Sequence, residues 1–146
     1  MLQTLRRLVL IFAAALIAPA IAAQDTVRPV IGNKIEAYTG RQNVQVKILR
    51  VGERSANQAL VQISGIDHDW DKRIQRMDIE KTFKDVRYSV EVNGKRHITL
   101  IMSNEIGELY LPGENQQTNI FPNSSLGREG NPEHFLTDFL QQSDGA

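Results

Sequence analysis

The part of the chain richest in chemically versatile side chains is a run of five residues: Asp67, His68, Asp69, Trp70 and Asp71. Its three carboxylates at alternate positions imitate the start of an EF-hand calcium loop, where such spacing directs oxygen atoms at one ion. Lys72 stands where that loop needs glycine for its sharp turn, and Asp78 replaces the longer glutamate that completes it. These departures argue against calcium, so we expect neither a metal nor another cofactor.

This run, residues 67–71, admits two interpretations that are compatible with each other. In the structural one, Asp67 or Asp69 accepts hydrogen bonds from nearby backbone N–H groups, and Trp70 plugs the edge of the core. In the functional one, the run protrudes as a recognition loop, because tryptophan offers a large rigid contact area and aspartates complement a basic partner. We predict a protein-binding site at these five residues, and exposure of Trp70 would strengthen that prediction.

The chain carries no recognisable catalytic motif. Its three histidines, His68, His97 and His134, are widely separated and form no H-E-x-x-H pair. Ser64 precedes a glycine but lacks the rest of the G-x-S-x-G motif, and no pair of carboxylates is singled out for glycoside hydrolysis. The absence of cysteine excludes thiol catalysis and Cys-ligated zinc. We therefore expect no catalytic residues and no enzymatic activity.

The composition also restricts the class of protein. The 146 residues include 17 Lys+Arg and 17 Asp+Glu, so the formal net charge is zero, which argues against a protein that binds nucleic acid. A hydrophobic content of 41% with 23% charged residues argues against a wholly disordered chain. The composition is that of one small globular domain.

Residues 1–22 have the pattern of a cleaved signal peptide. Arg6 and Arg7 supply a positive start, an apolar run follows, and Ala20-Ile21-Ala22 forms an A-x-A cleavage site. The uncharged stretch is sixteen residues long, shorter than the roughly 20 residues that a membrane-spanning helix needs. We expect export to the periplasm, with secretion as the alternative, and no membrane span after cleavage. The remaining domain, residues 23–146, is slightly acidic, with 15 Lys+Arg against 17 Asp+Glu.

Period-two alternation of apolar residues predicts an antiparallel strand meander over residues 44–111. Residues 44–51 and 59–63 form a first hairpin, and residues 73–82 form a weaker strand. Residues 27–31 have the composition of an edge strand, where a proline is tolerated.

The strongest local signal is Asn93-Gly94, which favours a two-residue type I′ turn within residues 86–101. Such a loop fixes the register. It places four pairs of residues opposite each other: Val92 and Lys95, Glu91 and Arg96, Val90 and His97, and Tyr88 and Thr99. We expect an ion pair between Glu91 and Arg96. Another turn over residues 104–107 leads into a strand at residues 108–111.

The end of the domain changes character. Residues 114–131 are polar and read as a long loop, which is either mobile or functional at this length. Asn131 and Pro132 then predict a helix over residues 132–142, with Asn131 as N-cap. Its apolar stripe consists of Phe135, Leu136, Phe139 and Leu140. We expect this helix to pack on the sheet, and docking to a partner is the alternative.

These observations predict a mainly β domain, a small antiparallel meander in the form of a sandwich or open barrel with one C-terminal helix. The functional hypothesis is an exported, non-enzymatic periplasmic binding protein with a protein partner in the cell envelope. Inhibitors of cell-wall hydrolases and immunity proteins against toxins share this size and compartment, which is an analogy without a motif. The alternatives are an envelope assembly component that docks through a sheet edge and the helix, and a barrel that binds a small ligand.

Overall fold

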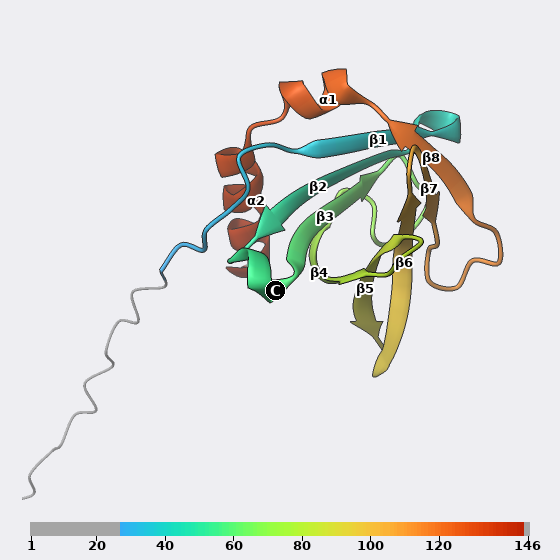
Figure 1. Cartoon of the computed structure of the whole chain (residues 1–146), viewed down its shortest axis with the longest axis horizontal. Helices are drawn as coiled ribbons and strands as arrows, with labels where there is room; N and C mark the ends of the chain where they lie inside the picture. Colours follow the sequence, from blue (N-terminus) through green and yellow to red (C-terminus); the bar gives the residue numbers. More distant parts are fainter. Residues whose placement is uncertain (1–26, 145–146) are drawn as a thin grey trace, which may run out of the picture.

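The computed structural model describes residues 27–144, so the predicted signal peptide lies outside the described residues. Eight antiparallel strands follow one another around a closed barrel, in which each strand pairs with the next and the last pairs with the first (Figure 1). They are β1 (Glu36–Gly40), β2 (Gln45–Val51), β3 (Gln58–Ser64), β4 (Ile74–Lys81), β5 (Val86–Val92), β6 (Lys95–Ser103), β7 (Ile106–Leu109) and β8 (Thr118–Pro122). The predicted β-rich meander is confirmed, and the sheet closes on itself.

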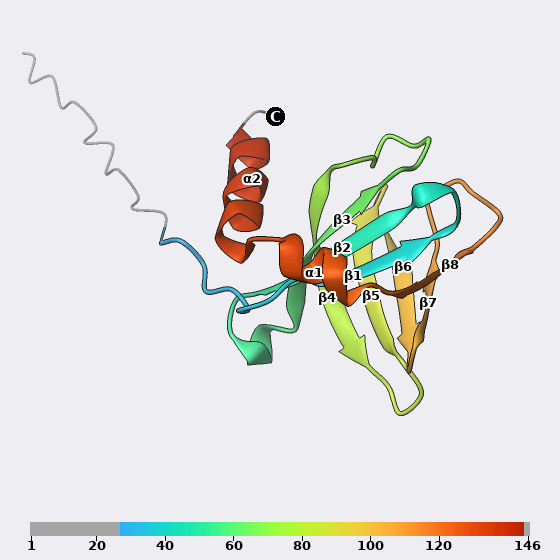
Figure 2. The ribbon, with the colours of Figure 1, turned by 90° about the horizontal axis from the view of Figure 1, so that it is seen from above.

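Short helical elements complete the fold. Two 3₁₀ turns, η1 (Arg41–Asn43) and η2 (Arg54–Ala56), connect β1 to β2 and β2 to β3, and the chain ends in α1 (Ser124–Glu129) and α2 (Pro132–Asp144). Both helices lie outside the barrel (Figure 2). No helix within residues 27–144 has the length and apolar character to cross a membrane.

Alternate side chains of β2 enter two separate cores, because successive residues of a strand point to opposite faces. Val46 and Ile48 point into the barrel and belong to its interior core. Leu49 and Val51 point outward and are covered by the C-terminal helix. The barrel is therefore packed on its inside, and it is also packed on the outer face next to α2.

Helix α2 packs on the barrel as predicted and extends two residues beyond the predicted end. Leu136 is fully buried and Phe135 nearly so in the outer core. The side chain of Asn131 accepts a hydrogen bond from the His134 N–H at 3.1 Å, which confirms the N-cap. The Gln142 amide bonds both backbone groups of Ile74 at 2.8 and 2.7 Å, so the end of the helix is fixed to the start of β4.

The β5–β6 hairpin has the predicted turn, with positive φ at Asn93 (52°) and Gly94 (77°). The first three predicted pairs are present, but Tyr88 lies opposite Leu100 and not Thr99. A register shift after Tyr88 leaves Thr99 as an extra residue on β6, which is the arrangement of a β-bulge. The predicted Glu91–Arg96 ion pair is also wrong, because Arg96 reaches across β5 and pairs with Glu80 of strand β4.

Three other sequence predictions need correction. The predicted loop 114–131 contains strand β8 and helix α1, and the Asn123 side chain caps α1 by accepting the Leu126 N–H at 3.0 Å. The turn after β6 is tighter than predicted, since Ser103 pairs with Ile106 and β7 ends at Leu109. The proposed edge strand at residues 27–31 is reduced to one bridge, and strand β1, which the pattern did not reveal, follows it.

Candidate functional site

The predicted site lies in the β3–β4 loop, at one end of the barrel. Its fold is set by Asp71, whose Oδ1 accepts hydrogen bonds from the N–H groups of Gly65 at 2.8 Å and Ile66 at 3.3 Å. This role was predicted for Asp67 or Asp69, so the predicted type of turn is present but a different aspartate forms it.

Trp70 is half-buried and packs against the interior core of the barrel. Its ring lies edge-on between two imidazoles, with centroid distances of 5.6 Å to His68 and 5.9 Å to His97. Such edge-to-face arrangements are favourable for aromatic rings. Trp70 therefore closes this end of the barrel, as the structural interpretation of the loop predicted.

The two histidines bind the β7–β8 connection, His68 from the β3–β4 loop and His97 from strand β6. His68 Nδ1 accepts the backbone N–H of Trp70 at 3.1 Å, and His68 Nε2 lies 2.9 Å from the carbonyl oxygen of Pro112. Because Nδ1 accepts, Nε2 must carry the proton and donate to Pro112. His97 Nε2 is likewise 2.9 Å from the carbonyl oxygen of Tyr110. These contacts give both rings a structural role.

The remaining two residues of the predicted site, Asp67 and Asp69, are exposed. Within residues 27–144 neither carboxylate takes part in a hydrogen bond or ion pair, although Lys72 and Arg73 follow closely in the chain. No group of three or more histidine or acidic side chains suited to a metal occurs among the described residues. The loop thus presents two exposed carboxylates next to side chains that hydrogen-bond the loop to itself and to the barrel end.

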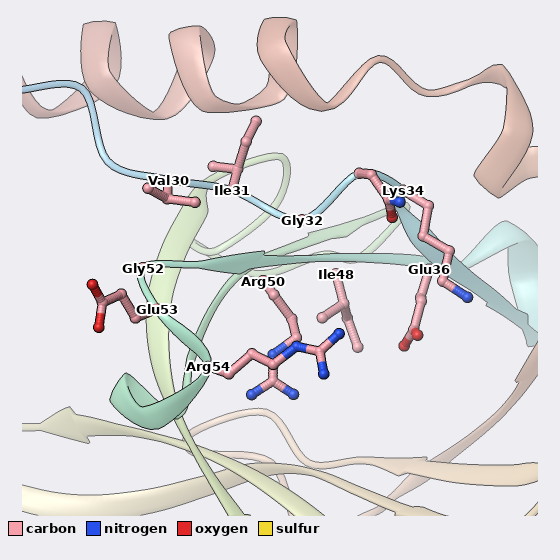
Figure 3. Close-up of a pocket in the computed structure, with 11 residues that line it drawn as sticks. Val30, Ile31, Gly32, Lys34, Glu36, Ile48, Arg50, Gly52, Glu53 and Arg54 are labelled. Atoms are coloured by element: carbon pink, nitrogen blue, oxygen red, sulfur yellow. The ribbon is translucent and has the colours of Figure 1, made fainter.

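The opposite end of the barrel contains a pocket that the sequence did not reveal, with a volume of about 470 Å³. It lies beneath the segment before β1 and the end of β2, and its lining includes Lys34, Glu36, Ile48, Arg50 and Arg54. Figure 3 shows that Arg50 and Arg54 extend to the same side of β2 as Ile48, away from helix α2. These residues gave no sequence signal, because isolated charges at a strand end resemble any solvated surface.

Two tyrosines belong to the inner face near this pocket. Tyr88 is buried in the interior core, and Tyr38 packs against it. Burial raises the pKa of Tyr88 to about 12, and the negative charge of Glu36 adds to this effect while Arg50 opposes it. The Tyr88 hydroxyl therefore stays neutral at physiological pH.

The middle of the barrel is filled by side chains. Leu100, Leu109 and Ile120 are fully buried there. A methyl group added to Gly107 would lie 2.7 Å from both Ile120 Cγ1 and Met102 Sδ, closer than atoms pack. Space for a ligand is therefore found at the mouth rather than in the centre.

Comparisons with protein-family models, with curated proteins and with solved structures find no match for this chain. A function is therefore inferred from the geometry of the two barrel ends.

Proposed function

We propose that this chain is a non-enzymatic binding protein of the cell envelope, which contacts a protein partner through the β3–β4 loop. The observation that carries the proposal is the pair of unpartnered, exposed carboxylates, Asp67 and Asp69, on a loop that Asp71 and His68 hold in one conformation. A loop that is already ordered loses little conformational entropy when it binds, so more of its contact energy remains as affinity.

The chemistry of the loop suggests the partner. Two carboxylates complement a cationic surface and increase the rate of encounter with it. An enzyme that acts on an anionic cell-wall polymer needs such a cationic cleft to attract its substrate. We therefore propose an inhibitor of a cell-wall hydrolase, or an immunity protein against a toxin of that kind, that acts in the periplasm after export by the signal peptide.

The contact residues differ in role from those expected at first. Asp67 and Asp69 are the proposed contacts. His68, Trp70 and Asp71 support the loop, because their polar atoms or rings are engaged within the barrel end. The alternative, docking through a sheet edge and the C-terminal helix, has less support. The pairing of β1 with β8 leaves no free sheet edge between these two strands, and the apolar face of α2 is covered by the barrel.

The test is capture of a partner from an envelope extract by the wild-type chain and by two charge-matched variants. Asp67→Asn with Asp69→Asn removes the proposed contacts, and Glu105→Gln with Glu129→Gln removes two exposed carboxylates elsewhere. We expect one protein to be captured by the wild type and by the control, and about tenfold less of it by the loop variant, because two charged contacts are lost. The purified chain should lower the hydrolytic activity of that partner.

Equal capture by the wild type and the loop variant would contradict the assigned contacts. Recovery of no partner, or of a partner whose hydrolytic or toxic activity is unaffected by the chain, would contradict the proposed function.

A further inference from the structure

The pocket at the end of the barrel opposite the β3–β4 loop is lined by two arginines without partners among the described residues, Arg50 and Arg54, and by the apolar side chain of Ile48. Arg50 follows Val46 and Ile48 at alternate positions of β2, so its side chain belongs to the inward-facing row and not to the outer surface. Arg54 reaches the same pocket from η2 (Figure 3). The guanidinium groups of Arg50, near the end of β2, and of Arg54, in the next element η2, therefore line one opening.

Neither guanidinium has a hydrogen-bond or ion-pair partner within residues 27–144. Three other arginines have ion-pair partners: Arg28 with Glu133, Arg87 with Asp85, and Arg96 with Glu80. Arg50 is half-buried and Arg54 is exposed. A planar guanidinium with free donors is well suited to bind a carboxylate or a phosphate in a bidentate manner.

The other charges of the lining leave a net positive pocket. Lys34 adds a third cation, and Glu36 and Glu53 are the two carboxylates. Figure 3 shows Glu53 extended away from the arginines. Glu36 lies on the same side of β2 as the two arginines. Its carboxylate would repel a ligand that carries a large negative charge.

The floor of the pocket is apolar. Ile48 is only 2% exposed and belongs to the interior core, whereas Val30 at the rim is 67% exposed. A ligand that covered Val30 would remove apolar surface from water, which is favourable in proportion to the area covered, and Ile48 would supply van der Waals contact beneath it. The volume of about 470 Å³ lies within the range of about 300–1,000 Å³ that is usual for small-molecule sites.

We propose that this pocket binds a small amphiphilic anion, with a carboxylate or phosphate on Arg50 and Arg54 and a short alkyl body against Ile48 and Val30. This site is independent of the acidic loop, because the two lie at opposite ends of the barrel.

Calorimetric titration of the full chain with octyl phosphate and with octanoate tests the proposal. Inorganic phosphate tests the contribution of the alkyl body, and octyl glucoside tests the contribution of the charge. We expect saturable binding of one or both amphiphilic anions, which weakens as salt is added. Inorganic phosphate and octyl glucoside should each bind at least about tenfold more weakly, because each lacks one of the two contacts.

Variants locate the site. Arg50→Gln with Arg54→Gln should weaken binding by about tenfold or more, as expected for the loss of charge-assisted hydrogen bonds. Arg73→Gln, which removes an exposed arginine at the other end, should leave affinity unchanged. Arg54→Gln alone changes an exposed residue and should weaken binding about threefold or more even if the double variant fails to fold. The methyl resonance of Ile48 should move on titration, whereas that of Ile74 in the outer core should not.

No binding of either amphiphilic anion would overturn the proposal, as would equal affinity of the folded arginine variants. Binding of octyl glucoside as tight as that of octyl phosphate would overturn the role of the arginines, and equal binding of inorganic phosphate would overturn that of the apolar floor. Asp67→Asn with Asp69→Asn should bind the anion normally, so failure of this site and failure of the acidic loop are distinguishable.

Discussion

The indole of Trp70 meets the imidazole of His97 edge to face, with ring centroids 5.9 Å apart and planes at 77°. This contact joins the β3–β4 loop to β6, and it explains why the only tryptophan of the chain lies in a loop and is nevertheless half-buried. The stability of this barrel end should therefore depend on the indole.

Trp70→Ala should lower the free energy of unfolding by about 2–3 kcal/mol, less than for a fully buried tryptophan because the ring is only half-buried. Trp70→Phe, which keeps an aromatic ring, should lower it by about half as much. Urea unfolding followed by circular dichroism measures both, since the fluorescent residue is lost. A change below about 0.5 kcal/mol for the alanine variant would show that the ring does not close the barrel.

Gly65 and Gly94 have the same φ of 77° but different surroundings. A Cβ on Gly65 would lie 2.4 Å from the backbone oxygen of Asn43, whereas a Cβ on Gly94 would meet nothing within 4 Å. Gly94→Ala should therefore cost about 1 kcal/mol for the backbone conformation alone. Gly65→Ala should cost at least about 2 kcal/mol more, because the backbone must also move. Equal losses in thermal unfolding would contradict the close approach of the two loops.

Tyr88 should make the protein sensitive to alkaline pH. Burial raises its pKa to about 12 from the ordinary value of 10.0, so between these values the hydroxyl ionises in the unfolded chain but not in the folded one. Stability should be independent of this group below pH 10 and should fall by up to about 2–3 kcal/mol as the pH rises to 12. Tyr88→Phe should lose this part of the dependence. Unfolding by urea at a series of pH values measures it, and an unchanged slope in the variant would contradict the assignment.

Helix α2 should contribute to the stability of the whole domain. Leu136 is fully buried against the barrel, so Leu136→Ala should lower the free energy of unfolding by about 2–5 kcal/mol in chemical denaturation. Asp138→Ala on the exposed part of the same helix serves as the control and should change it by less than about 0.5 kcal/mol. If both variants were as stable as the wild type, the helix would be free to dock elsewhere.

The elements that could be predicted are those whose conformation depends on residues adjacent in the sequence. The Asn93-Gly94 turn was predictable because its positive φ angles depend on two neighbouring residues. The shift that displaces Thr99 was not, since it arises where the hairpin is fitted into a closed barrel. Strand β1 escaped detection because only Ala37, Tyr38 and Thr39 lie between its end residues, too few to show an alternating pattern, and its pairing partners are β2 and the distant β8.

The same distinction applies to the two candidate sites. The position of Trp70 beside the core was predictable from a bulky ring within a polar turn. The assignment of the backbone contacts to Asp71 required the actual path of the loop. Arg50 and Arg54 are close neighbours in the chain, but the pocket that they line could not be predicted, because its other wall is the segment before β1, which meets β2 only in the folded barrel.

The pairing of Tyr38 with Pro122 joins residues that are roughly 80 positions apart in the chain. This barrel cannot close until strand β8 has been synthesised, and until then one edge of β1 has no pairing partner. Contacts over such long separations make folding slow compared with local hairpins. During that interval the open edges are exposed to pairing with other chains. The closure that protects the native protein thus makes its newly made chain vulnerable to aggregation.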